Sequence, residues 1–488
     1  MGGFFGAVSH RDVVLDVFFG TDYHSHLGTR SAGMAVWNGD RGCVREIHSI
    51  ANTPFRTRFE KDLPDFSGHI GIGCISDSDP QPLLVRSHLG LYAITTVGQI
   101  NNAEQLVDTY FSDHGHQFMA MGTGRVNATE LVAALINEGE SLCDGIRHAQ
   151  KVIDGSMSIL LMTGRGEIIA ARDRWGRTPV VIGRKESGFA ASFESSAFPN
   201  LGYEHVRDLG PGEVVKITQS GVETLQPPGP TERLCSFLHV YYGYPASSYN
   251  GRNVEYVRYR CGAALSKVAP VAADAVAGIP DSGVGHALGY ADKSGIKYAR
   301  PYVKYTPTWP RSFMPSNQAE RQHIAQMKLI PIPQLIEGKR LVFCDDSIVR
   351  GTQMRDQMKR VMADGAKEVH VRIACPPLLY GCPFINFSRS KSEMDLITRR
   401  IIRDLDGEGA DPAPYFDPDG LPYKTMVDRI RERLGLTTLA FQRLDDLVSA
   451  IGLPKEKLCT YCWTGKDVSE KGGCPCGGKC GKRMTNDK

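Results

Sequence analysis

Hydrophobic and polar positions follow a clear order in the second half of the chain, where an apolar run ends in two carboxylates. Residues 341–344 are consecutive apolar residues, which predicts a buried strand that leads into Asp345 and Asp346. From 353 to 364 the apolar positions recur at helical spacing, and another apolar run covers 369–374. The pattern therefore predicts a strand, a loop, a helix and a second strand, which is typical of a mainly parallel α/β sheet.

The remaining pattern divides the chain into two halves of different fold class. Upstream, short strand-like runs between glycine-containing turns predict an antiparallel sheet, and they cover 158–162, 168–172 and 179–183. Downstream, helical and strand-like segments alternate and predict a mainly parallel sheet; they cover 254–268, 274–279 and 285–294. Proline and glycine crowd residues 226–230 and exclude both helix and sheet there, so we place the main domain boundary near residue 230.

Polar loops follow two of the predicted strands, at the strand ends where α/β proteins bind ligands. Strand 274–279 leads into a loop at 280–283, and strand 341–344 leads into a loop at 345–352. Backbone N–H groups and hydroxyls at the start of a helix can surround a phosphate, and adjacent carboxylates suit a vicinal diol or Mg²⁺. We therefore predict a sugar-phosphate site whose candidate residues are Asp281, Ser282, Gly283, Asp345, Asp346, Ser347, Arg350, Gly351 and Thr352. The candidate Mg²⁺ ligands among them are Ser282, Asp345 and Asp346.

Composition narrows the class of protein. A chain of 488 residues is long enough for two or three domains with their own cores. Its 57 basic and 54 acidic residues leave a net charge of +3 without a long run of one sign, so the charge indicates neither a nucleic-acid nor a membrane partner. No apolar stretch approaches the length of a membrane span and no secretory signal is evident, so we expect a cytoplasmic enzyme. Thirteen cysteines are an odd number, which favours free thiols and metal ligands over disulfides.

The loop at 345–352 resembles the phosphoribosylpyrophosphate motif of type I phosphoribosyltransferases. A wider resemblance, to the glutamine phosphoribosylpyrophosphate amidotransferases (amidophosphoribosyltransferases), runs from the first residues to about 400 and resumes near 446. In that family a basic loop closes over the substrate, and the segment from Arg311 to Lys328 resembles it. The resemblance implies that Arg311 and Lys328 are catalytic cations. It also implies a homo-oligomer, either a dimer or a tetramer.

The same resemblance implies an α/β and α+β architecture of two domains. Residues 1–230 would form an αββα sandwich like that of the N-terminal-nucleophile (Ntn) amidotransferases, and residues 231–400 a type I phosphoribosyltransferase domain with a mainly parallel α/β sheet. Residues 401–445 match the family poorly, and we interpret them as an insertion. Residues 446–488 would form a C-terminal segment with cysteines and a polar tail.

Cysteines near the C-terminus indicate a metal site. Cys459 and Cys462 have the two-residue spacing of a ligand pair, but spacing alone cannot supply the other two ligands. Resemblance to the iron-sulfur branch of the family implies a structural 4Fe–4S cluster, with zinc as the alternative, and the ligand set is Cys235, Cys382, Cys459 and Cys462. Outside this pattern, a disordered tail and a second metal site remain open for Cys474, Cys476 and Cys480.

The first half lacks the residues that glutamine hydrolysis would need. In the family, the N-terminal cysteine attacks the glutamine amide, whereas this chain has Gly2 at that position. The resemblance further places Ser76, Val97 and Ala128 where the family has an arginine, an asparagine and an aspartate that hold the substrate. Cys74 is a poor replacement nucleophile because no terminal amine would serve as its base. We expect this domain to fold without hydrolysing glutamine.

These observations predict an enzyme that binds phosphoribosylpyrophosphate and Mg²⁺. It would transfer the phosphoribosyl group to ammonia, either free or delivered by a partner, as in the first step of purine biosynthesis. Two alternatives remain: a phosphoribosyltransferase with a different acceptor, and a regulatory subunit of a true amidotransferase. The acids at 345 and 346 weigh against the second alternative, because an interaction subunit does not need groups that bind a diol.

Overall fold

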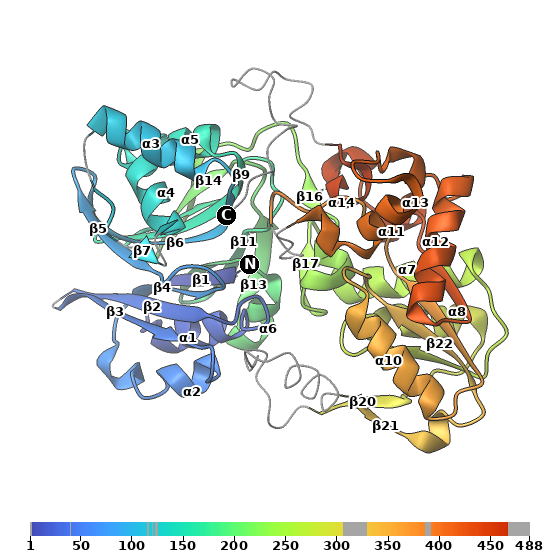
Figure 1. The fold of residues 1–488 in the computed structure, drawn as a ribbon. Coiled ribbons are helices and arrows are strands. Elements are labelled where there is room, and N and C mark those ends of the chain that lie inside the picture. The colour runs from blue at the N-terminus through green and yellow to red at the C-terminus, as the bar shows by residue number, and fades with distance from the viewer. Residues whose placement is uncertain are drawn as a thin grey trace.

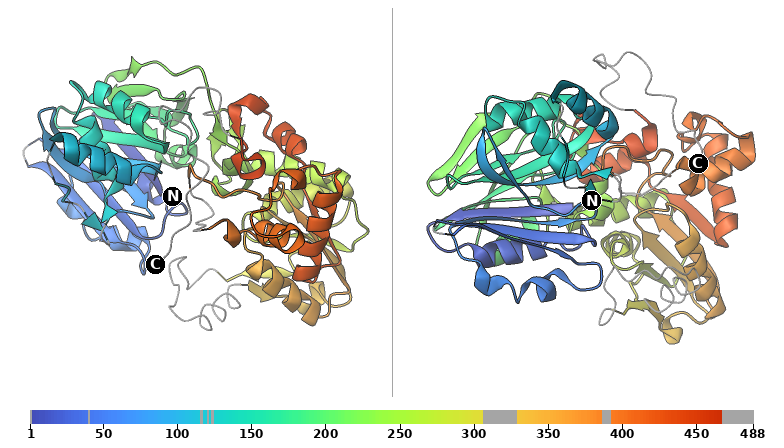
Figure 2. Two further views of the ribbon diagram at one scale, coloured as in Figure 1. Left: turned by 45° about the horizontal axis from the view of Figure 1, so that its top comes forward. Right: turned by 60° about the vertical axis from the view of Figure 1, so that its left-hand side comes forward.

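The computed structural model describes residues 2–39, 41–114, 117–119, 121–122, 125–305, 329–385 and 392–466. The predicted loop cations Arg311 and Lys328 lie outside these residues, as do Cys474, Cys476 and Cys480. Within the described part of the chain, no helix is both long and apolar enough to cross a membrane. The two halves of the chain lie side by side in Figure 1, and the views in Figure 2 separate them in the same way.

Two stacked antiparallel sheets form the centre of the first half. The seven-stranded sheet has, in spatial order, β13 (Glu204–Asp208), β11 (Val181–Lys185), β12 (Gly188–Ser192), β1 (Gly2–Ser9), β4 (Ile70–Ser76), β2 (Ser31–Asn38) and β3 (Gly42–Ser49). The six-stranded sheet has β15 (Gly221–Gln226), β14 (Val214–Thr218), β10 (Ile168–Ala171), β9 (Gly155–Thr163), β6 (Gly90–Ile100) and β5 (Leu83–Ser87). A buried core that includes Phe4, Ile72 and Leu160 joins the inner faces of the two sheets.

Helices cover the outer faces of both sheets. Outside the seven-stranded sheet are α1 (Val14–Asp22), α2 (Phe55–Phe59) and α6 (Phe198–Leu201), and outside the six-stranded sheet are α3 (Ala103–His114), α4 (Ala128–Ile136) and α5 (Leu142–Val152). A short hairpin of β7 (Met121–Gly122) and β8 (Arg125–Val126) precedes α4. These four layers are the predicted αββα sandwich, because each sheet buries one face against the other sheet and one against helices.

The second half is built on a four-stranded parallel sheet. Its strands, in spatial order, are β19 (Ala275–Gly278), β22 (Arg340–Asp345), β23 (Glu368–Ile373) and β24 (Thr438–Phe441). Leu341 and Phe343 face one core and Val342 and Cys344 the other, so the central residues of β22 are all apolar because both of its faces are buried. The helices are α7 (Val254–Val268), α8 (Gly283–Ser294), α10 (Thr352–Ala363), α11 (Ile397–Asp406), α12 (Leu421–Leu434) and α13 (Leu444–Ile451).

Short paired elements connect the two halves and border the loops. They are β16 (Leu234–Cys235) with β25 (Leu458–Cys459), β17 (Ser248–Tyr249) with β18 (Arg252–Asn253), and β20 (Tyr302–Lys304) with β21 (Leu329–Pro331), followed at the end of the described chain by α14 (Tyr461–Thr464). The parallel pair of β16 and β25 places the start of the second half beside its C-terminal segment (Figure 1).

The interpretation of residues 401–445 as an insertion requires a correction. This segment contains most of α11, all of α12 and strand β24, which pairs with β23 from His370↔Thr438 to Ile373↔Phe441. Met426, Ile430 and Leu434 of α12 are buried in the same core as β22. The segment therefore completes the parallel sheet. Its weak match to the family pattern did not predict this role, because an edge strand is defined by its packing and not by sequence identity.

The predicted elements around the two polar loops are confirmed. The strands predicted at 274–279, 341–344 and 369–374 correspond to β19, β22 and β23, and the helix predicted at 353–364 corresponds to α10. The strand predicted at 179–183 lies two residues further on, as β11 at Val181–Lys185, because Pro179 has no N–H to offer a sheet ladder.

Candidate active site and cysteine site

The loops after β19 and β22 converge on one buried carboxylate. Neighbouring parallel strands end at the same edge of the sheet, and β19 pairs with β22 up to Gly278↔Cys344. The Asp346 carboxylate accepts a hydrogen bond from Ser282 Oγ at 2.5 Å and another from Ser347 Oγ at 2.6 Å. Asp346 is 7% exposed. The predicted residues Ser282, Asp346 and Ser347 therefore share one site.

Asp345 lies beside this carboxylate. Its Oδ1 accepts a hydrogen bond from the backbone N–H of Asp346 at 3.0 Å. Burial raises the pKa of Asp345 well above its ordinary value, and the adjacent Asp346 carboxylate adds to this effect. Burial also raises the pKa of Asp346, against hydrogen bonds from Ser282 and Ser347 that lower it. Two adjacent acids of this kind favour a cation or a diol as a partner, because either would stabilise their charge.

Two glycines allow the two candidate loops to pack closely against neighbouring strands and helices. A Cβ at Gly283 would lie 2.3 Å from the carbonyl oxygen of Cys344, so only glycine lets α8 begin against the end of β22. Gly351 has φ +75° directly before α10, and a Cβ there would lie 2.6 Å from Ile397 Cδ1. The Ile397 N–H in turn donates to the carbonyl of Val349 at 2.8 Å, which holds the phosphate-binding candidate loop on α11.

The remaining predicted loop residues lie around this arrangement. Asp281 forms an ion pair with Lys304 of β20, and both side chains are largely exposed. Arg350 pairs with Asp395 at 3.2 Å, while its carbonyl accepts from Arg400 at 2.6 Å. Thr352 is exposed as the first residue of α10. The predicted loop residues thus lie together at one edge of the sheet.

Arg258 is a residue that sequence reasoning missed. It is 2% exposed on α7 and donates to the carbonyls of His239, Tyr241 and Gly243 at 3.1, 3.0 and 2.9 Å. Its positive charge also lowers the pKa of Asp346, although burial has the larger and opposite effect. The signal was an arginine on the apolar face of the predicted helix at 254–268, where a buried cation needs several acceptors.

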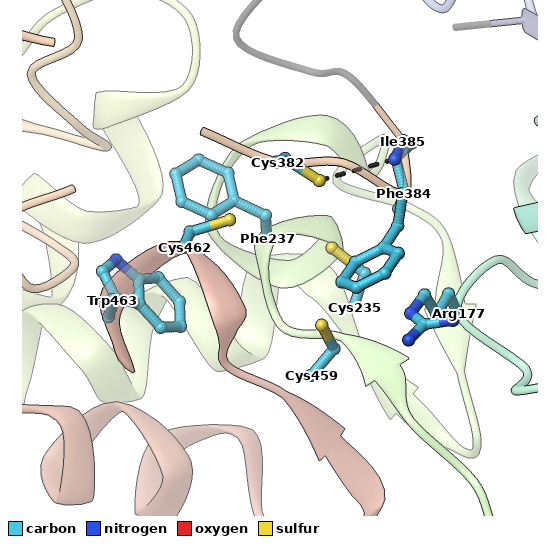
Figure 3. A pocket seen from close by; sticks show the side chains of 9 residues that line it. All are labelled: Arg177, Cys235, Phe237, Cys382, Phe384, Ile385, Cys459, Cys462 and Trp463. Atoms are coloured by element: carbon cyan, nitrogen blue, oxygen red, sulfur yellow. Dashed lines mark hydrogen bonds between the residues drawn. The ribbon is translucent and has the colours of Figure 1, made fainter. Parts of the chain in front are cut away.

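The four predicted cluster cysteines line one cavity between β16, β25, α14 and the loop at 382–385 (Figure 3). The cavity holds about 280 Å³, including space open to solvent, and its wall also contains Arg177, Phe237, Phe384, Ile385 and Trp463. The register Cys235↔Cys459 brings two of the thiols together, and Leu379 and Tyr380 N–H both donate to the Cys462 carbonyl at 3.0 Å. The cysteines thus come from three separate segments.

Protonation of these thiols is strongly affected by their neighbours. Burial raises the pKa of Cys235 well above its ordinary value, and Cys459 and Cys382 raise it further. A hydrogen bond with Cys382 and burial do the same for Cys462. Among the residues that the structure describes, no three His, Cys, Asp or Glu side chains are grouped around a point where one metal ion could bind. A 4Fe–4S cluster takes one thiolate on each iron, so its ligands stand further apart than the sulfurs of one zinc ion, which are about 3.8 Å apart.

Comparison with known proteins identifies the family. A model described as a glutamine amidotransferase domain matches residues 69–200. The amidophosphoribosyltransferase of Methanocaldococcus jannaschii is 32% identical, and the match covers 96% of this chain and 98% of that protein. The chain belongs to the amidophosphoribosyltransferase family. Members of this family are glycosyltransferases of the pentosyltransferase class.

Solved structures of amidophosphoribosyltransferases agree with the fold. The glutamine phosphoribosylpyrophosphate amidotransferase from Bacillus subtilis, complexed with ADP and GMP, superposes with a TM-score of 0.81 at 29% identity, and the match covers 95% of this chain and 96% of that chain. A structure described as the allosteric regulatory enzyme of purine biosynthesis gives a TM-score of 0.80 at 28% identity, with 95% of both chains covered. The Ntn-type sandwich and the phosphoribosyltransferase domain are therefore both present.

Gly2, which the sequence resemblance predicts to match the family's nucleophile, lies where a side chain has little room. Gly2 pairs with Ser76 across β1 and β4, and a Cβ at Gly2 would lie 2.4 Å from the carbonyl oxygen of Ile75. Real Cβ atoms do not approach a backbone oxygen so closely, so a cysteine here would require the backbone to move. Cys74 is fully buried, and burial raises its pKa to about 12, which disfavours the thiolate that a nucleophile needs.

Gln81 contacts the surroundings of Ser76, Val97 and Ala128, the other positions at which the sequence predicts a lost glutamine contact. Its Nε2 donates to Ser76 Oγ at 3.4 Å, and its Oε1 accepts from Thr96 N at 2.7 Å and from Thr129 Oγ1 at 3.2 Å. Thr96 and Thr129 directly neighbour Val97 and Ala128 in the chain. Ser76 and Val97 are buried at 2% and 3% exposure, and Asn127 caps α4 just before Ala128. Neutral hydrogen bonds thus hold this region together.

Proposed function

We propose that the chain binds phosphoribosylpyrophosphate with Mg²⁺ and transfers the phosphoribosyl group to ammonia, which forms 5-phosphoribosylamine for purine biosynthesis, without hydrolysing glutamine. One observation carries the proposal. The buried Asp346 carboxylate accepts hydrogen bonds from Ser282 of one loop and Ser347 of the other, which joins both candidate loops into one site. The named amidophosphoribosyltransferase relatives support the same reaction class.

In the proposed reaction, the bond between C1 of the ribose and the pyrophosphate oxygen breaks and a bond between C1 and the ammonia nitrogen forms. Pyrophosphate leaves with the bonding electron pair, and the new amine releases one proton to solvent. Mg²⁺ would supply charge neutralisation on the leaving pyrophosphate. The adjacent carboxylates of Asp345 and Asp346 fit it, together with the Ser282 hydroxyl.

The chain's own residues would bind and orient the substrate. Asp345 and Asp346 would accept hydrogen bonds from the ribose hydroxyls, and Asp281 and Ser282 would lie against the pyrophosphate. The loop at 347–352, which leads into the N-terminus of α10, would hold the 5-phosphate through backbone N–H groups. Arg311 and Lys328 would close over the site and exclude water, in keeping with the family's basic loop.

Loss of glutaminase activity is the second part of the proposal. An N-terminal nucleophile needs a side chain at position 2, and the 2.4 Å approach to Ile75 opposes one. A bound glutamine also needs charged partners for its carboxylate and amino groups, whereas Ser76 and Ala128 are neutral. Ammonia would therefore reach the site from solution or from a partner protein.

The cysteine site fits a structural 4Fe–4S cluster held by Cys235, Cys382, Cys459 and Cys462. The four thiols come from three chain segments and line one cavity, which matches the four-thiolate ligand set of such a cluster. Thiols that raise one another's pKa also favour a cationic centre that replaces their protons. The cluster would supply cross-links between three chain segments, and the phosphoribosyl transfer would not pass through it.

Pyrophosphate release tests the reaction directly. Protein purified without oxygen would receive phosphoribosylpyrophosphate and Mg²⁺, with ammonium in one sample and glutamine in another. We expect release with ammonium alone, at a rate that rises with the fraction of free ammonia. Comparable release with glutamine would overturn the claim of a lost glutaminase. No pyrophosphate release in either sample, with substrate still bound, would overturn the ammonia reaction and favour another acceptor or a regulatory subunit.

A further inference from the structure

Arg177 is a buried cation in the wall of the cysteine cavity, and it comes from the other half of the molecule. All four thiols belong to residues 235–462, whereas Arg177 lies between β10 and β11 of the sandwich. Its side chain is 1% exposed. Figure 3 places its guanidinium group beside Cys235 and Cys459, on the side of the cavity opposite Trp463. The cavity is thus completed by a residue of the glutaminase-like half.

Backbone contacts fix Arg177 against the first cysteine ligand. The Arg177 carbonyl accepts a hydrogen bond from the Cys235 N–H at 3.1 Å, and the Trp175 carbonyl accepts one from the Arg233 N–H at 2.7 Å. The Arg177 N–H itself donates to the Asp173 carboxylate at 2.8 Å. The turn that carries Arg177 is therefore attached to the strand that carries Cys235.

The guanidinium group also contacts the loop of a second cysteine ligand. Arg177 Cζ lies 3.6 Å from the centre of the Phe384 ring, which is two residues beyond Cys382. A cation over an aromatic face is attracted by the negative charge of that face, and more strongly when the pair is shielded from water. The ring of Phe384 is also part of the cavity wall, so this contact holds the guanidinium group at that wall.

We infer that Arg177 balances the charge of the proposed iron-sulfur cluster and so makes the glutaminase-like half part of the cysteine site. Four thiolates contribute −4 and an oxidised 4Fe–4S core +2, so the bound cluster would carry about −2. A buried guanidinium within the same wall lowers the electrostatic cost of that charge, and it favours the reduced cluster, which is one unit more negative. This inference rests on the cluster proposed above.

The test compares Arg177→Met and Arg177→Lys with Arg174→Met, a control variant at an exposed arginine three residues away. All are purified without oxygen, and iron content and the cluster's midpoint potential are measured by redox titration with electron paramagnetic resonance. We expect Arg177→Met to make the reduced cluster about tenfold less favoured, which is about 59 mV for a one-electron couple. Arg177→Lys should stay closer to wild type, and Arg174→Met should equal it.

An unchanged potential in an iron-loaded Arg177→Met protein would overturn the inference and leave the cluster intact. If Arg177→Met fails to retain iron, the iron content of Arg177→Lys distinguishes the two explanations. Iron retained in the lysine variant supports a role for charge, and equal loss in both variants overturns the inference. Wild-type protein that binds no iron would instead overturn the cluster itself, so the two failures are distinguishable.

Discussion

The two halves of this protein differ at the sites that the family resemblance predicts. At the edge of the parallel sheet, acids and hydroxyls from two loops contact one another, and Gly283 lies where a Cβ would be 2.3 Å from a backbone oxygen. In the sandwich, the position predicted to match the family's nucleophile is Gly2, and Gln81 forms neutral hydrogen bonds with Ser76 and Thr96 nearby. Under the proposed function, the difference teaches that a fold can be kept while its chemistry is lost.

Packing demands explain why the sandwich would persist under the proposed loss of glutamine hydrolysis. Arg172 is buried beside the Arg177 turn and donates to the carbonyls of Thr178 and Gly176 at 2.8 and 2.7 Å. It also lies 3.1 Å from Glu232, close to the start of the second half. A buried arginine with this many acceptors is costly to disturb, because any lost partner leaves a charge unsatisfied. The sandwich therefore supports the junction even if it hydrolyses nothing.

The largest expected effect is at the phosphoribosyl edge. Asp346→Asn should reduce ammonium-dependent pyrophosphate release by at least about a hundredfold, because the amide cannot hold both a ribose hydroxyl and a cation. The melting temperature should stay near that of wild type. Asp292→Asn, at an exposed carboxylate on α8, is the matched control. Activity retained in Asp346→Asn would remove this residue from the proposed site.

Loss of one cysteine ligand should affect the junction between the halves. Cys459→Ser should yield protein with less iron and no brown colour, and its melting temperature should fall because β16, β25 and the loop at 382–385 lose their common support. Iron analysis and absorbance spectra measure the first effect and calorimetry the second. Cys143→Ser, on α5 far along the chain from this cavity, is the control. Full colour and stability in Cys459→Ser would contradict the four-cysteine assignment.

Introducing the family's predicted cysteine and arginine into the sandwich should not produce glutamine hydrolysis. Gly2→Cys combined with Ser76→Arg should give no glutamine hydrolysis, and Gly2→Cys alone should destabilise the fold by up to about 3 kcal/mol, because its Cβ meets the Ile75 carbonyl. Glutamate formation and denaturant unfolding are the measurements. Gly39→Cys, where a Cβ meets no atom within 4 Å, is the control. Glutamate production by the double variant would show that the pocket is less altered than its geometry indicates.

Sequence reasoning succeeded where local pattern and chemistry coincide. The apolar run at 341–344 followed by Asp345 and Asp346 located both β22 and the convergence of loops, since parallel strands end at a common edge. Arg177 and Arg258 could not be found in this way. Their roles depend on contacts with segments distant in sequence, such as Phe384 for Arg177 and the carbonyls near His239 for Arg258.

The interpretation of residues 401–445 as an insertion was wrong for a related physical reason. The segment's strand, β24, is only four residues long, and its burial comes from pairing with β23 and from packing of α12, neither of which leaves a strong periodic signal. The sequence also resembles the family poorly there, so neither the resemblance nor the hydrophobic pattern predicted this strand. Short edge strands are specified mainly by tertiary contacts, which the sequence alone does not display.

The smallest expected effect concerns acid stability and the buried histidines of the second half. Burial, with a smaller contribution from Arg258, lowers the pKa of His286 to about 3, and its Nε2 lies 3.2 Å from the Val240 carbonyl. In the unfolded chain this imidazole gains a proton near pH 6.5, whereas in the folded chain it stays neutral. The unfolded state therefore binds more protons between pH 6.5 and about 3, and stability falls as the pH is lowered through that window.

His286→Gln should weaken that dependence. Between pH 6.5 and 5 the histidine accounts for about 2 kcal/mol of lost stability in wild type, and the variant should lose that much less over the same range. Denaturant unfolding at several pH values measures the slope, with His10→Gln at an exposed position as the control. The sandwich also buries a histidine, since burial lowers the pKa of His24 to about 4. Burial also lowers the pKa of His239 in the second half to about 4, so a slope unchanged in His286→Gln would assign the acid sensitivity to His24 or His239.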